Sequence, residues 1–435
     1  MTTVLFWFRN DVRLTDNAAL LEAINGATRA GAHLLPLFCH DDSADAITAW
    51  DFVRVGNHRR HFLRATLDDL TQQLRALGSD LIELTGRAQE VIPILAEALG
   101  ATQLITEAIA APEEEDAIAA LRSAGLTVDT VWQSSLLDPA DLPCAVNRLP
   151  DMFTAFRHAV EKAEVLPPVP VPAIRQMPPL PALPSTIANR IQSALPIAIE
   201  PDARSSFPYW LPAFVGGETA GLNHLERYFD TQLAHSYKQT RNGLSGTDYS
   251  TKFSPWLASG ALSARTIYVR LKQFEHEHGA SDSSYWIWFE LLWRDYFRFL
   301  HLKYGRQLYR ARGLAQVGIA PPRHHAAMFK RWCHGATGEP LVDAGMRELF
   351  ATGYLSNRLR QVVASYLIHD LGGDWRAGAA WFEAQLIDYD VTSNQGNWLY
   401  LAGRGTDPRG GRRFDPKKQA RDYDVDRRFQ GMWST

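Results

Sequence analysis

A proline-rich segment separates two parts of this chain that differ in hydrophobic periodicity. Residues 164–184 contain eight prolines, and further prolines continue to Pro212. Because proline fixes the φ angle and lacks an amide donor, the segment predicts an extended, polyproline-like linker rather than core. We therefore expect two domains, 1–132 and 206–435, joined by an interdomain connection over residues 133–205.

Residues 1–132 alternate short apolar runs with amphipathic stretches. A 3.6-residue apolar period over residues 58–78 predicts a helix that ends at a glycine. The apolar runs predict strands at residues 3–8, 32–39, 80–86, 103–109 and 127–132. This alternation favours an α/β domain with a doubly wound, mostly parallel sheet. Because no GxGxxG motif follows the first strand, an ordinary dinucleotide-binding domain is not indicated.

The strand signals vanish after the proline-rich segment. Helical periodicity instead continues through residues 221–240, 254–278, 284–305, 339–353, 357–372 and 375–387. Residues 206–435 are therefore predicted to form an all-α domain.

The composition, 46% hydrophobic and 21% charged, is typical of a soluble globular protein. No apolar run approaches the length of about eighteen residues that a membrane span needs. The N-terminus lacks the features of a secretory signal, so we expect a cytoplasmic protein. Three scattered cysteines, Cys39, Cys144 and Cys333, provide neither a disulfide framework nor a metal or iron–sulfur site.

The net charge of −3 argues against a protein that is basic throughout, but not against a local basic surface. Residues 404–428 hold nine Lys and Arg against five Asp. Such an excess suits contact with a polyanion. On charge alone, a solvated tail explains it equally well.

Residues 237–260 are dense in Gly, Ser and Thr, and then change to a helical pattern at Ser254, which precedes a proline. A hydroxyl cap followed by proline at the first helical position is a typical helix start. The backbone amides there, together with Ser250, Thr251 and Lys252, would suit phosphate oxygens. An ordinary capped loop is the alternative.

The segment 285–303 predicts a helix with an aromatic stripe at Trp286, Phe289, Trp293 and Phe297. Such stripes are usually core. Glu290, however, lies one turn before Trp293, and it has i, i+4 spacing with Arg294. A carboxylate and a large ring at one rim of a cleft suit the binding of a flat base by stacking and a polar contact.

Two carboxylates begin the segment 388–405, DYDVTSNQGNWLYLAGRG. Asp388 and Asp390 project to the same side if they lie in an extended turn, where they would accept hydrogen bonds from ligand hydroxyls or an imide N–H. A buried carboxylate needs a cationic partner, and Arg358 and Arg360 upstream supply two candidates.

Carboxamide and indole groups follow in the same segment. Asn394 offers both a donor and an acceptor to a ring nitrogen that changes protonation. Trp398 is an oxidisable ring close in sequence. With the carboxylates, these groups indicate a pocket around a flat, redox-active, polyhydroxylated ligand. A structural turn with a core tryptophan fits the spacing equally well.

These segments together resemble the photolyase/cryptochrome family, and most closely its DASH-type cryptochrome branch. The resemblance spans nearly the whole chain. Its motifs are WFRNDVRLTDN (7–17), YKQTRNGLSGTDYSTKFSPWLASG (237–260), ELLWRDYFR (290–298), GATGEPLVDAGMREL (335–349), SNRLRQVVASYL (356–367), DWRAGAAWF (374–382), DYDVTSNQGNWLYLAG (388–403) and KKQARDYD (417–424). It implies an N-terminal α/β domain joined by a long linker to a helical FAD-binding domain.

The resemblance also implies that FAD lies in a bent form deep in the helical domain. The residues that match its phosphate and ribityl contacts are Tyr237, Ser250, Thr251, Lys252 and Ser254. Arg360 and Asp388 match an ion pair stacked against the flavin. Asp390 matches a further flavin contact, and Asn394 matches the residue that faces flavin N5. Arg294 falls in the same cofactor cavity.

In this family, a photoexcited reduced flavin passes one electron to a cyclobutane pyrimidine dimer, the ring splits, and the electron returns. The lesion must leave the base stack to reach the flavin. The residues that match lesion-pocket positions are Glu290, Trp293 and Asn357. Those that match positions near the DNA backbone or pocket are Arg241, Arg358 and Arg412.

Three positions in the matched motifs bear on which lesion and which form of DNA the resemblance implies as the substrate. A (6-4) photolyase is expected to have His where this chain has Asn357, which favours the cyclobutane dimer. Tyr400 and Gln361 stand where duplex-repairing photolyases carry a second Trp and a Met. The smaller apolar area leaves less energy to offset the unpairing of a duplex, so single-stranded or looped DNA is the expected substrate.

Flavin photoreduction in the family runs along a chain of tryptophans. Trp398 and Trp375 match its proximal and middle members, but the distal position holds Pro322. Trp332 is a candidate substitute exit. The family often also holds a folate antenna, 5,10-methenyltetrahydrofolate, on an acidic residue after the fourth strand. Here Ala108 stands at that position, with Glu107 one residue away.

The leading hypothesis is therefore a blue-light-driven, FAD-dependent enzyme, expected to be a monomer, that repairs dimers in single-stranded or looped DNA. The second is a blue-light sensory or regulatory flavoprotein that binds nucleic acid or a partner without turnover. A general flavin oxidoreductase ranks last, because the chain has no nicotinamide-binding fingerprint.

Overall fold

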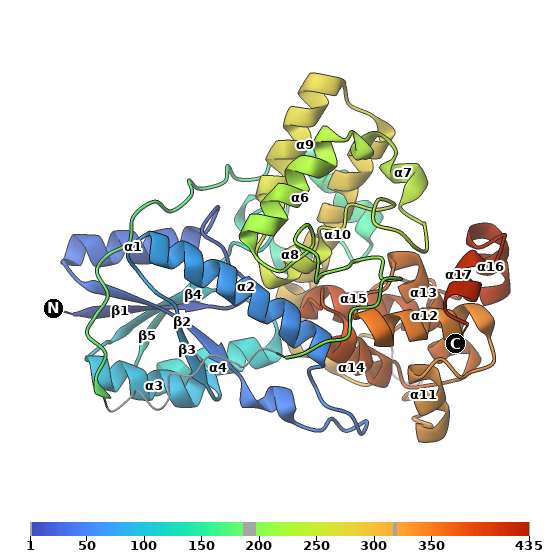
Figure 1. The fold of residues 1–435 in the computed structure, drawn as a ribbon, viewed down its shortest axis with the longest axis horizontal. Coiled ribbons are helices and arrows are strands. Elements are labelled where there is room, and N and C mark those ends of the chain that lie inside the picture. The colour runs from blue at the N-terminus through green and yellow to red at the C-terminus, as the bar shows by residue number, and fades with distance from the viewer. Residues whose placement is uncertain (1, 186–196, 316–319, 435) are drawn as a thin grey trace.

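The computed structural model describes residues 2–185, 197–315 and 320–434. It has an α/β domain at the N-terminal end and a helical domain at the C-terminal end, as Figure 1 shows. The expected fold class is confirmed in both halves. None of the described helices is long and apolar enough to cross a membrane.

The α/β domain is built on a five-stranded sheet with the order β3-β2-β1-β4-β5. Every adjacent pair of strands is parallel, as predicted. The strands are β1 (Thr3–Phe8), β2 (His33–His40), β3 (Ile82–Thr85), β4 (Gln103–Glu107) and β5 (Thr127–Val131). Because neighbouring β1 residues point to opposite faces, Phe6 and Phe8 enter one core cluster, while Leu5 and Trp7 enter another.

Helices cover both faces of this sheet. Figure 1 shows α1 and α2 on one face and α3 and α4 on the other. The helices are α1 (Ala18–Ala30), α2 (Asn57–Ala76), α3 (Ala88–Leu99) and α4 (Pro112–Ser123), with a 3-10 turn, η1, at Asp42–Asp45. Burial of all six β1 residues is what a parallel sheet covered on both faces requires.

The expected interdomain connection, 133–205, contains more structure than its sequence predicts. It includes the short turns η2 (Pro139–Asp141) and η3 (Val146–Arg148) and the helix α5 (Phe153–Lys162). Residues 165–184 form neither helix nor strand. Within them, Ile174 and Met177 are buried in the core of the α/β domain. The prediction that this segment lies outside the core is therefore wrong at these two residues. Residues 186–196 lie outside the described residues.

The helical domain follows. Its elements are α6 (Glu218–Asp230), η5 (Leu233–His235), α7 (Tyr237–Thr240), α8 (Ser254–Ser259), α9 (Ala264–His278), α10 (Asp282–Tyr304), η6 (Gly305–Tyr309), α11 (Ala326–Cys333), α12 (Pro340–Thr352), α13 (Asn357–Ser365), the π-helical turn η7 (Tyr366–Asp370), α14 (Trp375–Gln385), α15 (Val391–Ala402), α16 (Pro416–Tyr423) and α17 (Arg428–Met432).

One predicted helix, 254–278, is divided in the structure into α8 and α9. Gly260 ends α8 with φ of 70°, a left-handed conformation that glycine adopts without strain. A Cβ at this position would lie 1.8 Å from the carbonyl oxygen of Asn10. The break therefore lets the backbone of the helical domain approach the α/β domain closely.

Candidate functional site

A cavity lies between α13, α14 and α15 in the helical domain. Seven of the residues that line it are predicted site residues: Asn357, Arg360, Gln361, Asp388, Asp390, Asn394 and Trp398. Some of these were matched to flavin contacts and others to lesion contacts. Phe382 and Leu386, from the α14 region, supply apolar walls.

Arg360 and Asp388 form the expected ion pair, with 2.8 Å between Nη2 and Oδ2. Arg360 also donates from Nε to the carbonyl oxygen of Leu355, which fixes the plane of its guanidinium. The other Asp388 oxygen, Oδ1, is buried and has no hydrogen-bond partner among the described residues. A buried acceptor without a donor is uncommon in folded proteins, and this one would suit a ligand hydroxyl or N–H.

Ser254 does not cap the helix that it begins, so that prediction is wrong. Helix α8 starts at Ser254 itself, and no side chain accepts a capping hydrogen bond there. The hydroxyl instead donates to Asp388 Oδ2 at 2.6 Å. Ser254 thus links the start of α8 to the Arg360–Asp388 ion pair.

Asp390 caps the N-terminus of α15 and also neutralises a buried arginine. Its Oδ1 accepts from the Ser393 amide and the Thr392 hydroxyl, both at 2.7 Å, as an N-cap does. Its Oδ2 lies 2.6 Å from Arg298 Nη2. Burial alone would raise the pKa of Asp390, but Arg298 and Arg294 more than reverse this and hold it well below its usual range.

Arg298 was missed by the sequence analysis. It is a buried member of α10, one turn after Arg294. The i, i+4 spacing of two arginines in a largely apolar helix was the available signal. Arg294 itself bonds to the carbonyl oxygens of Ser134 and Leu257, and burial lowers its pKa to about 10.

Asn394 lies on the first turn of α15 with one end of its carboxamide already fixed. Its Nδ2 donates to the carbonyl oxygen of Ala379 at 3.0 Å. Its oxygen is consequently the atom left to face a ligand in the cavity. Trp398, one turn later, packs so closely on Gly378 that a Cβ there would lie 2.2 Å from the indole.

The predicted phosphate loop places Lys252 in an aromatic cage. Its Nζ lies 3.4 Å from the centre of the Tyr249 ring and 4.8 Å from that of Tyr354. It has no hydrogen-bond partner among the described residues, and burial lowers its pKa well below the usual value. Ser250 and Thr251, which precede it, are half-buried.

Outside the lining of that cavity, a second group of predicted residues gathers beside α10. Glu290 pairs with Arg241 at 2.7 Å, and burial raises the pKa of the Glu290 carboxyl. The same guanidinium lies 4.6 Å from the Trp286 ring centre and 5.9 Å from that of Tyr237, which is buried. The structure thus brings Tyr237, Arg241 and Glu290 together.

Trp293 has one face covered. Phe153, from α5 in the expected linker, stacks on it with 3.8 Å between ring centres and 14° between planes. Tyr400 approaches Trp293 edge-on at 6.1 Å. Phe153 was missed because the connection was expected to lack a helix.

The two remaining predicted DNA contacts are arginines that do not line this cavity. Arg358 donates to Asn242 at 2.7 Å and lies over the Tyr423 ring. Arg412 donates from Nε to the Tyr400 hydroxyl at 2.8 Å. Four of the nine basic residues in 404–428 are paired with carboxylates, in Arg409–Asp407, Arg413–Asp370, Lys418–Asp422 and Arg428–Asp426.

The predicted tryptophan chain is only partly continuous in ring contacts. Trp398 meets Trp332 edge-on, with 6.4 Å between ring centres. The Trp375 indole donates to the carbonyl oxygen of Ala311. Trp332 is completely buried, so it could relay an electron but could not itself exchange one with solvent.

Glu107 ends β4 in complete burial, and neither carboxylate oxygen has a hydrogen-bond partner among the described residues. Burial, and then the neighbouring Asp11, raise the pKa of Glu107 to about 7. Ala108 uses its amide to continue the sheet, donating to Val131. Across the described residues, no cluster of three or more acidic, His or Cys side chains could hold a metal.

Comparisons with known proteins match both halves of the chain. A family model described as "DNA photolyase" matches residues 4–175, and one described as "FAD binding domain of DNA photolyase" matches residues 286–434. A protein named "Cryptochrome DASH" from Gloeobacter violaceus is 44% identical over 438 residues, which cover 99% of this chain and 85% of the relative. One from Xenopus laevis is also 44% identical, covering 99% and 82%.

Solved structures show the same likeness. A Synechocystis sp. cryptochrome has a TM-score of 0.92 and 41% identity, with coverage of 100% of this chain and 88% of the other. A bacterial class III photolyase from Agrobacterium tumefaciens has a TM-score of 0.79 and 27% identity, with coverage of 100% and 86%.

Proposed function

This chain belongs to the photolyase/cryptochrome family, in its DASH-type branch, and from that premise we propose that it repairs cyclobutane pyrimidine dimers in single-stranded or looped DNA under blue light. One observation carries the proposal. Asn357 and Gln361, matched to the lesion pocket, line the same cavity as Asp388 and Asn394, matched to flavin contacts. A lesion and a flavin in that cavity would be close enough for direct electron transfer.

The residues present fit FAD. The unpartnered oxygen of Asp388 would accept from the cofactor, and Arg360 would lie against it as a fixed cation. Asn394, anchored through Ala379, would present its oxygen to flavin N5 and hold a proton there. Bound FAD supplies the light absorption and the one-electron chemistry, while the protein orients the reactants and excludes water.

The lesion side would be held by polar groups and rings. Glu290 and Asn357 would bond to the base edges, and Trp293 and Tyr400 would contact the rings. Arg241, Arg358 and Arg412 would bind phosphates. Tyr400 and Gln361 offer less apolar area than the larger pair of a duplex-repairing enzyme, so a lesion that is already unpaired is favoured.

Repair is tested by illuminating chemically reduced protein with a dimer-containing oligonucleotide and measuring restored thymines. We expect light-dependent repair of the single strand and much slower repair of the same lesion in a duplex. Undamaged strand and darkness serve as controls. Equal rates on both forms would contradict the single-strand preference, and tight lesion binding without turnover would instead support a sensory role.

Replacing Trp398 with phenylalanine should abolish flavin photoreduction, because it removes the oxidisable ring that lines the cavity. Chemically reduced variant should still repair lesions. Transient absorption after a laser flash measures the first effect and the thymine assay measures the second. Trp375→Phe is the matched comparison, and photoreduction that survives in Trp398→Phe would refute the role of this indole.

A folate antenna is a separate part of the proposal. A pterin ring carries adjacent N–H donors, and the ionised Glu107 carboxylate would offer it two oxygens that have no hydrogen-bond partner in the described part of the chain. We expect added 5,10-methenyltetrahydrofolate to remain with the protein through gel filtration, and Glu107→Gln to release it. Folate that elutes separately from FAD-loaded protein would remove the antenna and leave the repair proposal intact.

A further inference from the structure

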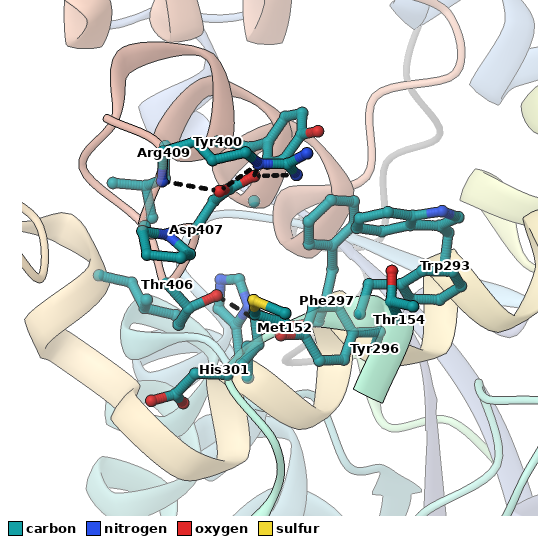
Figure 2. Close-up of a pocket in the computed structure, with 18 residues that line it drawn as sticks. Met152, Thr154, Trp293, Tyr296, Phe297, His301, Tyr400, Thr406, Asp407 and Arg409 are labelled. Carbon is teal, nitrogen blue, oxygen red and sulfur yellow. Dashed lines mark hydrogen bonds and ion pairs between the residues drawn. The ribbon is translucent and has the colours of Figure 1, made fainter. Parts of the chain in front are cut away.

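A second cavity is lined by a different set of α15 residues from the first. It is bounded by α10, the start of α5 and the loop after α15. It encloses about 230 Å³. Figure 2 shows Trp293, Phe297 and Tyr400 on its border, with Met152, Thr154 and Thr406 around it. Trp293 and Tyr400 are also the rings that we assign to the lesion, so they form the border between this cavity and the proposed lesion site.

The walls of this cavity are apolar and uncharged. Phe153, Trp293, Tyr296, Phe297 and Tyr400 supply aromatic rings. His301 is neutral at physiological pH, because burial lowers its pKa to about 4. The Tyr296 hydroxyl lies 3.4 Å from that of Thr406, which leaves a short polar edge within an aromatic enclosure.

The rim, in contrast, is charged. Asp407 pairs with Arg409 at 2.5 Å, and Arg409 is exposed. Asp151, on the other side of the rim, is neutralised by Lys303 at 2.6 Å. Arg412 lies against the Tyr400 ring on the same border. The two carboxylates at the rim are each neutralised by a cation, and Arg412 adds one further positive charge beside the aromatic enclosure. That arrangement suits a flat ring whose phosphate backbone lies outside.

We propose that this cavity takes one unpaired nucleobase of the bound strand, next to the flipped dimer. An apolar cavity of about 150 Å³ in other proteins accepts benzene, so the larger volume here is sufficient for a single base. The hydroxyls of Tyr296 and Thr406 offer partners for the base edge. The inference rests on the proposed function, because it requires that the chain bind single-stranded DNA.

Such a base pocket would add to the discrimination between single strands and duplexes. A base in a duplex would have to break its pair to enter, which costs energy that an unpaired base does not spend. The preference would then come from two positions on the strand, the lesion and its neighbour.

The test combines removal of the base with filling of the cavity. Thr154 lies at an exposed position in the first turn of α5, so Thr154→Trp can place an indole in the cavity without disturbing the core. Thr154→Ala is the matched control. FAD content and circular dichroism establish that both variants fold. The affinity of each protein is then measured for dimer-containing single strands. These strands carry either a normal base or an abasic site at one of the positions that flank the dimer.

In the wild type and in Thr154→Ala, loss of the correct flanking base should weaken binding about 5- to 150-fold, the range for one base–aromatic stack. In Thr154→Trp, affinity should already be reduced, and loss of that base should have no further effect. Equal losses in all three proteins would overturn the base pocket while DNA binding stands. Failure of the wild type to bind any strand would overturn both proposals.

A free nucleoside, rather than a base of a DNA strand, is the alternative occupant of this cavity. Titration with 2-aminopurine riboside, followed by its fluorescence, measures this separately. We expect no saturable binding of the nucleoside alone, because it lacks the phosphate contacts at the rim. Saturable binding that Thr154→Trp abolishes, with strand binding unchanged, would assign the cavity to a free nucleoside and contradict the proposal.

Discussion

Replacing Asp388 with alanine should release FAD from the protein and destabilise the helical domain. The change removes the carboxylate that pairs with Arg360 and accepts from Ser254, and it leaves a half-buried guanidinium without a counter-charge. Removing one partner of a buried ion pair costs about 3 kcal/mol or more. It also removes the unpartnered oxygen that we assign to the cofactor.

Absorbance of bound flavin after gel filtration measures the first effect, and chemical denaturation measures the second. The FAD content and the free energy of unfolding of Asp388→Asn should lie between those of the wild type and the alanine variant, because asparagine keeps a hydrogen-bond acceptor but not the charge. Asp426→Ala breaks an exposed ion pair with Arg428 and should cost less than about 1 kcal/mol. Full FAD content in Asp388→Ala would contradict the assigned role.

Replacing Asp390 with alanine should have the largest effect on folding. The carboxylate caps α15 and neutralises Arg298, whose side chain is 7% exposed. An uncompensated buried arginine costs about 3–5 kcal/mol, and the lost cap about 1 kcal/mol more if the two effects add. Because typical domains have only about 5–15 kcal/mol of stability, the variant should be largely insoluble or unfolded at 37 °C.

The effect of Asp390 depends on pH in a defined direction. Its pKa in the folded protein lies below the value of about 3.9 in an unfolded chain, so its stabilisation is complete above that value and is lost as the pH falls below it. Asp390→Asn keeps a capping side chain but not the charge. The difference in free energy of unfolding between the wild type and Asp390→Asn should therefore narrow below about pH 4. A difference that stays constant from pH 7 to pH 3 would refute the assigned ion pair.

The sequence allowed much of the fold to be predicted, because patterns of period 2 and 3.6 are local. The strands and long helices follow from them. The pairing of Arg360 with Asp388 was instead expected from the family resemblance, whose motifs contain both residues. What could not be predicted depends on distant contacts. The break at Gly260 depends on Asn10, and the hydroxyl of Ser254 turns to Asp388 rather than to its own helix.

The same reason explains the other differences at the site. Arg298 reaches Asp390 across 92 residues of sequence, and Phe153 stacks on Trp293 from a segment that reads as linker. Lys252 was assigned to phosphate from the sequence, and local pattern did not indicate that the folded chain places its ammonium against two tyrosine rings. Trp332 lies deep in the core, which no local pattern indicates.

The flavin content of the purified protein tests the central claim most directly. We predict one FAD per chain by visible absorbance after denaturation and release, and restoration of that ratio when FAD is added back to stripped protein. A colourless protein that is folded by circular dichroism, and that takes up no added FAD, would contradict the whole account of the cavity between α13 and α15.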